Sequence, residues 1–573
     1  MQRDHDAISN GTDRIELIAI LIVAIATMIF AYFLVTAFFY GPGVVSAFDS
    51  PIYAQLASDI AHHGYYGLDN AGPLATFYLF LTYIALFYKL LGVNTYSGTM
   101  ANFLLLALSF VGIYKIGSLL NGRKSGILSA IIYVIIPFNI IDTASLGVNI
   151  LLGLITISTV LFMLMGYKEK RARRSALYYG LSGLFLMLNV IAMIEGVIIS
   201  LIVLPFLAYL LIKSGRRSLS HIALPFIAGV ALGLGLIVLF GILSGGAPLS
   251  VFAVDMSWYG NQAIAPHSTP GIGLLALYLQ TMFPYYSIIG HSLVCWANFC
   301  QALPLPNNTT NLSLLTYTIK NTAIFGYVSG LTFYLALIFG LYMLTKRNRV
   351  MLLPVLWVIL PLIYLSFGTM SIHSYVGISF VPRFVSIMFP GAALIIGMGI
   401  TDMLLGNIQQ KSKNISIEDR RHLKRYVGIS VALLLLLLLF FQCFYISRYV
   451  LYTEYSYLYP VIAFGNEINS QYEGTTYVFS NVPIDVIMPY TGYFKNYTYL
   501  TSVTNCSQLS ASSSSILLCG YNNPAVITRC GFKQINIERP QWLSSYFIFN
   551  GVGVIPYQLS SNVSFECYGY VAR

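Results

Sequence analysis

The stretch FDSPIYAQLASDIAHHGYYG gathers carboxylates and imidazoles between two long apolar runs. Asp49 is the leading candidate for a general base, because a carboxylate can take the proton of a hydroxyl as it attacks. The alternative is structural: Asp49 or Ser50, standing before Pro51, is a good start for a helix. Both roles are compatible if Ser50 supplies the helix cap.

The helix after this proline is expected to be amphipathic and to lie along a membrane interface. Tyr53, Leu56 and Ala57 fall on one face, and Tyr53 is also a sugar-contact candidate. The other side is more polar and carries Gln55, Ser58, Asp59 and His62. His62 and His63 are candidates for an acceptor or metal site, although the polar end of a helix is the simpler interpretation.

Four further ionisable residues accompany apolar runs. Asp142 and Glu195 are expected at the outer tips of two helical hairpins, as parts of an acceptor or metal site or as solvated tips. Arg383 is the one Lys or Arg between residues 350 and 410. A guanidinium at the outer end of a span suits a bidentate pair with a phosphate, which His373 would assist. A lipid anchor or an ion pair with Asp142 or Glu195 is the alternative.

A long loop, residues 244–320, carries the aromatic and amide cluster SWYGNQ. Trp258 and Tyr259 are candidates for stacking against a sugar. We favour an interfacial belt, because Trp and Tyr concentrate at membrane surfaces in any case.

The composition of the chain indicates what kind of elements hold these residues in place. The chain has 573 residues, of which 57% are hydrophobic and 9% charged. Soluble domains are about 25% charged, so this composition predicts a multi-pass membrane protein. Most of the 31 basic residues lie in short segments between apolar runs, as in cytoplasmic loops. The net charge of +11 therefore reports orientation and does not indicate a nucleic-acid partner.

The loops predict a cell-membrane protein with a cytoplasmic N-terminus and about thirteen transmembrane helices. The first apolar run, 15–40, is too long for a cleaved signal peptide. Residues 98–121 fit one span or a hairpin, and Arg123 with Lys124 favours the hairpin. The other expected spans are 73–91, two within 125–167, two within 176–213, 219–243, 321–345, 350–370, 383–406 and 426–447.

The remaining segment, residues 448–573, predicts a small extracytoplasmic domain of mixed α/β structure. Short β-rich runs separated by polar turns favour strands: TTYVFS, NYTYL, SSILLC, AVITRC and YFIF. Residues 1–447 then form the transmembrane domain.

Cysteines and glycosylation sequons agree with an outer location for this segment. Four cysteines fall in it, which predicts up to two disulfides with three possible pairings: Cys506, Cys519, Cys530 and Cys567. Free buried thiols are the alternative. Most N-x-S/T sequons also fall in expected outer regions, which predicts a glycoprotein: Asn307, Asn308, Asn311, Asn496, Asn505 and Asn562.

Two motifs carry a resemblance that extends over roughly residues 15–447. FDSPIYAQLASDIAHHGYYG with the following AGPLATFYLFLTYIALFYKLLG resembles the first outer loop of GT-C type glycosyltransferases. VPRFVSIMFPGAALIIG resembles their arginine–aromatic entry into a late span. The resemblance is to the branch of protein O-mannosyltransferases and aminoarabinose transferases, particularly its archaeal-type members.

This resemblance implies a GT-C-like bundle and a hexosyl or pentosyl transfer. A sugar on a polyprenyl phosphate, such as dolichyl phosphate, would pass to a protein, lipid or glycan acceptor on the extracytoplasmic face. Asp49 would act as the base and Arg383 would hold the donor phosphate. Asp49 and Asp142 are candidates for a divalent cation. The sugar, the acceptor and the oligomeric state stay open.

The chain departs from the family's pattern at several positions. Asp49–Ser50 stands where many family members have an acidic pair, and Asn149 stands where many have an Asp. A family Lys aligns loosely with Asn189, and another is absent before Pro73. These departures keep a second class of function open, a non-enzymatic membrane anchor whose tail binds the cell envelope. A transporter is less favoured, since no inverted repeat is visible.

Overall fold

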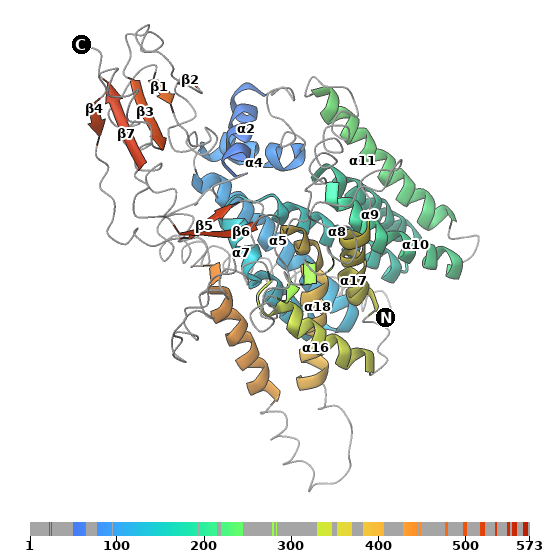
Figure 1. The fold of residues 1–573 in the computed structure, drawn as a ribbon. Coiled ribbons are helices and arrows are strands. Elements are labelled where there is room, and N and C mark those ends of the chain that lie inside the picture. The colour runs from blue at the N-terminus through green and yellow to red at the C-terminus, as the bar shows by residue number, and fades with distance from the viewer. Residues whose placement is uncertain are drawn as a thin grey trace, which may run out of the picture.

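The chain folds as a helical bundle followed by short strands (Figure 1). The computed structural model describes residues 22, 25, 50–64, 77–93, 95–192, 194–214, 219–243, 275, 278–279, 282–283, 329–345, 352–368, 382–405, 428–444, 446–447 and seven strands between 476 and 570.

The first helices form one continuous chain of contacts. Helix α2 packs on α4, α4 on α5, and α5 on both α6 and α8. A bend of 56° separates α6 from α7, at a proline in the first turn of α7 that cannot continue the backbone hydrogen bonds. Their bounds are α2 Ser50–His63, α4 Tyr78–Leu91, α5 Thr95–Asn121, α6 Arg123–Val134, α7 Pro137–Ala144 and α8 Asn149–Lys168.

Helix α18 lies inside the bundle, among helices from both halves of the chain. This helix packs against α6, α16 and α17. The bounds are α9 Ala172–Ala192, η2 Ile194–Ile199, α10 Ser200–Ser214, η3 Leu219–Ala223, α11 Leu224–Leu243, α16 Thr332–Thr345, α17 Leu352–Phe367, η5 Pro382–Met388, α18 Phe389–Ile400, η6 Thr401–Leu405 and a last helix, Gly428–Phe444.

Length and apolar composition confirm a mainly helical, multi-pass membrane protein. Within the described residues, four helices are long and apolar enough to cross a membrane, or five if α6 and α7 count as one broken span. Shorter apolar helices accompany them, among them α4, α16 and α17. The count of about thirteen stays a prediction, and most of the first expected span, 15–40, lies outside the described residues.

Burial separates central helices from peripheral ones. In the span Phe384–Met403, 94% of an apolar stretch of 18 residues is buried inside the protein. The corresponding share in Ser220–Leu243 is 28%. Helix α11 correspondingly exposes large side chains, including Leu224, Ile227 and Leu232. Hydrocarbon chains cover such a face in a bilayer, so α18 is a core element and α11 a lipid-facing one.

The hairpin predicted at residues 98–121 is wrong, because α5 is a single helix of 27 residues. A helix of that length extends roughly 40 Å, enough for one crossing of the hydrocarbon core. Helix α4 has only 14 residues, or roughly 21 Å, and is short for a span. Arg123 and Lys124 favour the hairpin only when residues 73–91 form a full span, and α4 is shorter than such a span.

The described residues of the C-terminal segment are strands. Five of them form a sheet in the order β2-β1-β3-β7-β4, and β5 pairs with β6. Strands β2, β1 and β3 are parallel, whereas β7 is antiparallel to both β3 and β4. The bounds are β1 Thr476–Phe479, β2 Tyr497–Leu500, β3 Ile516–Tyr521, β4 Lys533–Ile535, β5 Phe547–Asn550, β6 Gly553–Gln558 and β7 Phe565–Tyr570.

Four of the five β-rich runs coincide with strands β1, β2, β3 and β5. The fifth run, AVITRC, lies outside the described residues. The division into domains at residue 447 and the outer location of the tail stay predictions.

Glycines let α9 and α11 approach closely. A Cβ on Gly229 would collide with the carbonyl oxygen of Gly180, and one on Gly183 with that of Phe226. Small residues at helix contacts allow this backbone approach in membranes, where packing has to replace the hydrophobic effect.

We expect Gly229→Ala to lower the stability of the bundle by about 1–3 kcal/mol, because the methyl group meets backbone atoms that cannot move aside. Gly235→Ala on the same helix is the matched control, since no atom lies within 4 Å of its Cβ position. Thermal unfolding of both variants in lipid nanodiscs measures the difference. Equal midpoints for the two would contradict the packing described.

Candidate functional site

Helix α5 runs in the same direction as α8 and α18 and packs against both. At one end, Asn102 of α5 contacts the turn that precedes α8. At the other end, Lys168 Nζ of α8 donates to the Leu119 carbonyl at 3.0 Å, and Asn121 Nδ2 donates to Asp402 Oδ1, beyond α18, at 2.9 Å. We call the first the turn end and the second the basic end, where Arg123 follows α5.

Asp142 closes the turn between α7 and α8. Its side chain is only 6% exposed. Oδ1 accepts a hydrogen bond from Asn149 Nδ2 at 2.9 Å, and Oδ2 accepts one from the Ile150 N–H at 2.9 Å. The first N–H groups of a helix have no partner within it, so this carboxylate caps α8 and interacts favourably with its dipole. We call residues 142–150 the Asp142 turn.

The backbone of the Asp142 turn admits little change. Leu146 has a φ of 57°, in the left-handed region that a bulky residue rarely adopts. The N–H of Gly147 donates to the Asp142 carbonyl at 2.7 Å. A Cβ on Gly147 would collide with the Asp142 carboxylate. Glycine is required here because the carboxylate occupies the space of a side chain.

Asn102 joins α5 to the Asp142 turn. Its side chain is fully buried, and its Nδ2 donates to the Gly147 carbonyl at 3.0 Å and to the Asp142 carbonyl at 3.4 Å. The sequence analysis missed this residue. The available signal was an amide within an apolar run, since such a group needs a partner in a membrane.

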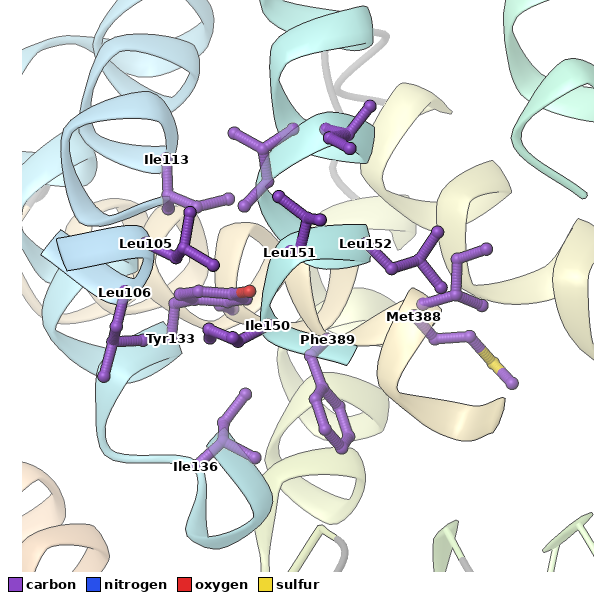
Figure 2. Close-up of a cluster of buried hydrophobic side chains, with 14 of the residues drawn as sticks. Leu105, Leu106, Ile113, Tyr133, Ile136, Ile150, Leu151, Leu152, Met388 and Phe389 are labelled. Carbon is purple, nitrogen blue, oxygen red and sulfur yellow. The ribbon is translucent and has the colours of Figure 1, made fainter. Parts of the chain in front are cut away.

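Apolar side chains support the turn from the bundle side. Figure 2 shows Ile150 and Leu152 at the start of α8, with Met388 and Phe389 of the η5–α18 junction beside them. Segment η5 packs against α8 and α17, and Trp357 Nε1 donates to the Ile387 carbonyl at 3.1 Å. The segment that carries Arg383 is therefore held next to the start of α8.

Helices α2 and α4 reach the same end through α5. Tyr53 of α2 is 1% exposed and makes edge-to-face contacts with Phe77 and Phe80, each at 5.6 Å between centroids. Tyr88 of α4 and Leu146 of the Asp142 turn both lie within 3.1 Å of the Cβ position of Gly98 in α5. Helix α4 therefore reaches the turn end, and α2 packs on α4.

The predicted amphipathic face of α2 is confirmed, since Tyr53, Leu56 and Ala57 are buried. Ser58 was predicted on the polar side but is buried as well, so the buried face is wider than expected. His62 is exposed. Ring packing accounts for the burial of Tyr53, and its contact with a sugar stays a prediction.

The other predicted site residues are placed only in part. Asp49, His373, Trp258 and Tyr259 lie outside the described residues. Arg383 in η5, Glu195 in η2 and His63 in α2 are located by their backbone, and their side chains lie outside the description. Asp142 was expected at a hairpin tip, and a turn is found there, but its carboxylate is buried rather than solvated. No group of three His, Cys, Asp or Glu gathers among the described side chains.

Asn189 joins α9 to α8. The family pattern described above has a lysine that aligns loosely with this position. Thr156 Oγ1 donates to Asn189 Oδ1 at 2.8 Å. Asn189 Nδ2 donates to Thr159 Oγ1 at 2.9 Å and to the Phe185 carbonyl at 3.0 Å. The amide is fully buried and satisfied, so this position serves helix packing.

Comparison with known proteins now adds to this geometry. The family described as dolichyl-phosphate-mannose-protein mannosyltransferase matches residues 73–242, which include the Asp142 turn and Asn189. The predicted resemblance to glycosyltransferases that use polyprenyl-phosphate sugars is confirmed. No curated protein sequence matches the chain.

Solved structures share the fold over almost the whole chain. ArnT from Cupriavidus metallidurans bound to undecaprenyl phosphate has a TM-score of 0.54 at 11% identity, covering 96% of this chain and 97% of that one. Its apo state has a TM-score of 0.51 at the same identity and coverage. The Archaeoglobus fulgidus oligosaccharyltransferase, at 0.47 and 12% identity over 81% of this chain and 62% of its own, is too distant to support an argument.

We expect Asp142→Ala to lower the stability of the protein by about 3 kcal/mol, because it leaves two buried donors without an acceptor. Asp142→Asn should cost less, since its amide oxygen can still accept from the Ile150 N–H. Thermal midpoints in nanodiscs measure both changes. A wild-type midpoint for Asp142→Ala would contradict the capping role.

Proposed function

We propose that the protein transfers a sugar from a polyprenyl-phosphate donor to a protein, lipid or glycan acceptor on the extracytoplasmic face. One observation carries the proposal: the family match covers residues 73–242 and includes the Asp142 turn. The likeness of the whole fold to ArnT supports it. A hexosyl or pentosyl transfer fits this class of enzyme.

The positive-inside rule supports placing the turn end outside. Arg123 and Lys124 follow α5 directly and mark the basic end, which faces the cytoplasm in this proposal. Helix α5 then runs inward, and α4 lies with α2 at the outer end. The first outer segment therefore extends through Leu91, and α4, at 14 residues, is an outer helix rather than a span.

The proposed reaction needs a base and an anion site at the turn end. Asp49 takes the proton of the acceptor hydroxyl as its oxygen attacks the anomeric carbon. The bond between that carbon and the phosphate oxygen breaks, and the lipid phosphate leaves with the electron pair. Arg383 pairs with this phosphate, where a guanidinium offers two parallel hydrogen bonds. His373 assists at the phosphate.

In this proposal Asp142 positions the site and does not react. Its carboxylate orders the start of α8, against which η5 packs with Arg383 at its beginning. Both Asp142 oxygens already accept hydrogen bonds, so they fit a cation poorly. Three further assignments stay predictions: a divalent cation at Asp49, an acceptor role for Glu195, His62 or His63, and sugar contacts by Trp258 or Tyr259.

Transfer by the purified full-length protein in nanodiscs tests the proposal. A panel of polyprenyl-phosphate hexoses and pentoses would be offered with Ser/Thr-rich peptides, glycans and lipid acceptors. We expect transfer by the wild type and a loss of about 10²-fold or more in Asp49→Asn, the size of a general-base contribution. Arg383→Ala should also lose transfer, and Arg383→Lys should keep part of it.

Asp59→Asn is the matched control, because it removes a carboxylate from α2, ten residues after Asp49. Equal transfer by Asp49→Asn and Asp59→Asn would contradict the base assignment. A stable but inactive Asp142→Asn would assign that carboxylate to the chemistry instead. A folded wild type that transfers no sugar from any donor would favour the membrane-anchor function.

A further inference from the structure

Two cysteines face each other across the sheet of the C-terminal segment. Strands β3 and β7 are antiparallel, and their register pairs Cys519 with Cys567. The neighbouring positions pair Leu518 with Tyr568 and Gly520 with Glu566, so the register is continuous around the cysteines. The sequence alone left three pairings of the four tail cysteines open.

This register meets the backbone requirement of a disulfide. Directly opposite residues of an antiparallel pair have Cα atoms about 4.5 Å or about 5.5 Å apart and belong to the same face of the sheet. A disulfide joins Cα atoms that are about 4.4–6.8 Å apart. Both kinds of opposite position satisfy this distance.

On the other side of β7, the described strand β4 offers Cys567 no competing cysteine. Strand β4 pairs with β7, and the residue opposite Cys567 there is Ile535. Among the described strands, Cys519 is therefore the one cysteine in register with Cys567. Cys506 and Cys530 lie outside the described residues.

We propose that Cys519 and Cys567 form a cross-strand disulfide in the mature protein. The oxidant is a disulfide-bearing compound or protein of the extracytoplasmic space. One cysteine thiolate attacks the oxidant's S–S bond and releases its first thiolate. The second cysteine thiolate then attacks the mixed disulfide and releases the other. The two protein thiols are oxidised, one external disulfide is reduced, and the two protons pass to the released thiolates.

The bond would fix β7 to the parallel part of the sheet. It links residues 48 positions apart and encloses the segment that contains β4, β5 and β6. This inference is independent of glycosyl transfer and requires only that the segment faces an oxidising compartment.

Peptide mapping of the wild-type protein from native membranes tests the pairing. Free thiols are blocked with N-ethylmaleimide before denaturation and digestion without reductant. Trypsin leaves Cys506 and Cys519 in one peptide, because no Lys or Arg lies between Asn496 and Ile527. A second cleavage after Leu and Tyr by chymotrypsin then separates these two cysteines.

We expect a linked peptide pair that contains Cys519 and Cys567 and disappears on reduction. Cys519→Ser should then expose one additional thiol, Cys567, to a maleimide–polyethylene glycol label in the unreduced, denatured protein. Cys443→Ser, in the last helix, is the control and should expose none. Linkage of Cys519 to Cys506 or Cys530, or N-ethylmaleimide on both Cys519 and Cys567, would overturn the proposal. The outcome of the glycosyl-transfer assay does not depend on whether this disulfide is found.

Discussion

A buried carboxylate at the start of α8 constrains the rest of the bundle. An ionised group in an apolar interior is costly unless hydrogen-bond donors surround it, and Asp142 meets this need with a side-chain amide and a helix N–H. The same residue accepts from Gly147 through its carbonyl. One residue thereby sets the path of the chain from α7 into α8. Because Asn102 donates to the same turn, the start of α5 is fixed with it.

The position of the proposed site follows from this constraint. Helices α5, α8 and α18 begin at the same end. Trp357 of α17 ties down η5 by a hydrogen bond, and the apolar cluster around Phe389 packs beside the start of α8 (Figure 2). Close glycine contacts bring the helices together elsewhere, as between α9 and α11. Arg383, the phosphate-binding residue that we propose, therefore lies on a segment that packs against the bundle, which favours a preorganised phosphate site.

The sequence predicted most helices of the bundle because long apolar runs need little context to be recognised. It also predicted four strands of the tail and the buried face of α2. It failed at α5, where one continuous helix replaces a hairpin, because charge at one end cannot fix the number of crossings when α4 is short. Asp142 was placed in a turn but expected in water, because the sequence pattern did not show that the turn folds back and brings Asn149 and the Ile150 N–H onto its carboxylate. The register of Cys519 and Cys567 likewise depends on strand pairing that no local pattern specifies.

Photo-crosslinking of a polyprenyl phosphate tests most directly the claim that the turn end receives a lipid phosphate. The full-length protein in nanodiscs would be irradiated with an undecaprenyl-phosphate analogue that carries a diazirine beside the phosphate. We expect crosslinked peptides from η5 and from the start of α2. Unlabelled undecaprenyl phosphate should reduce their yield. Crosslinks confined to the lipid-facing helix α11, or unaffected by the competitor, would contradict the claim.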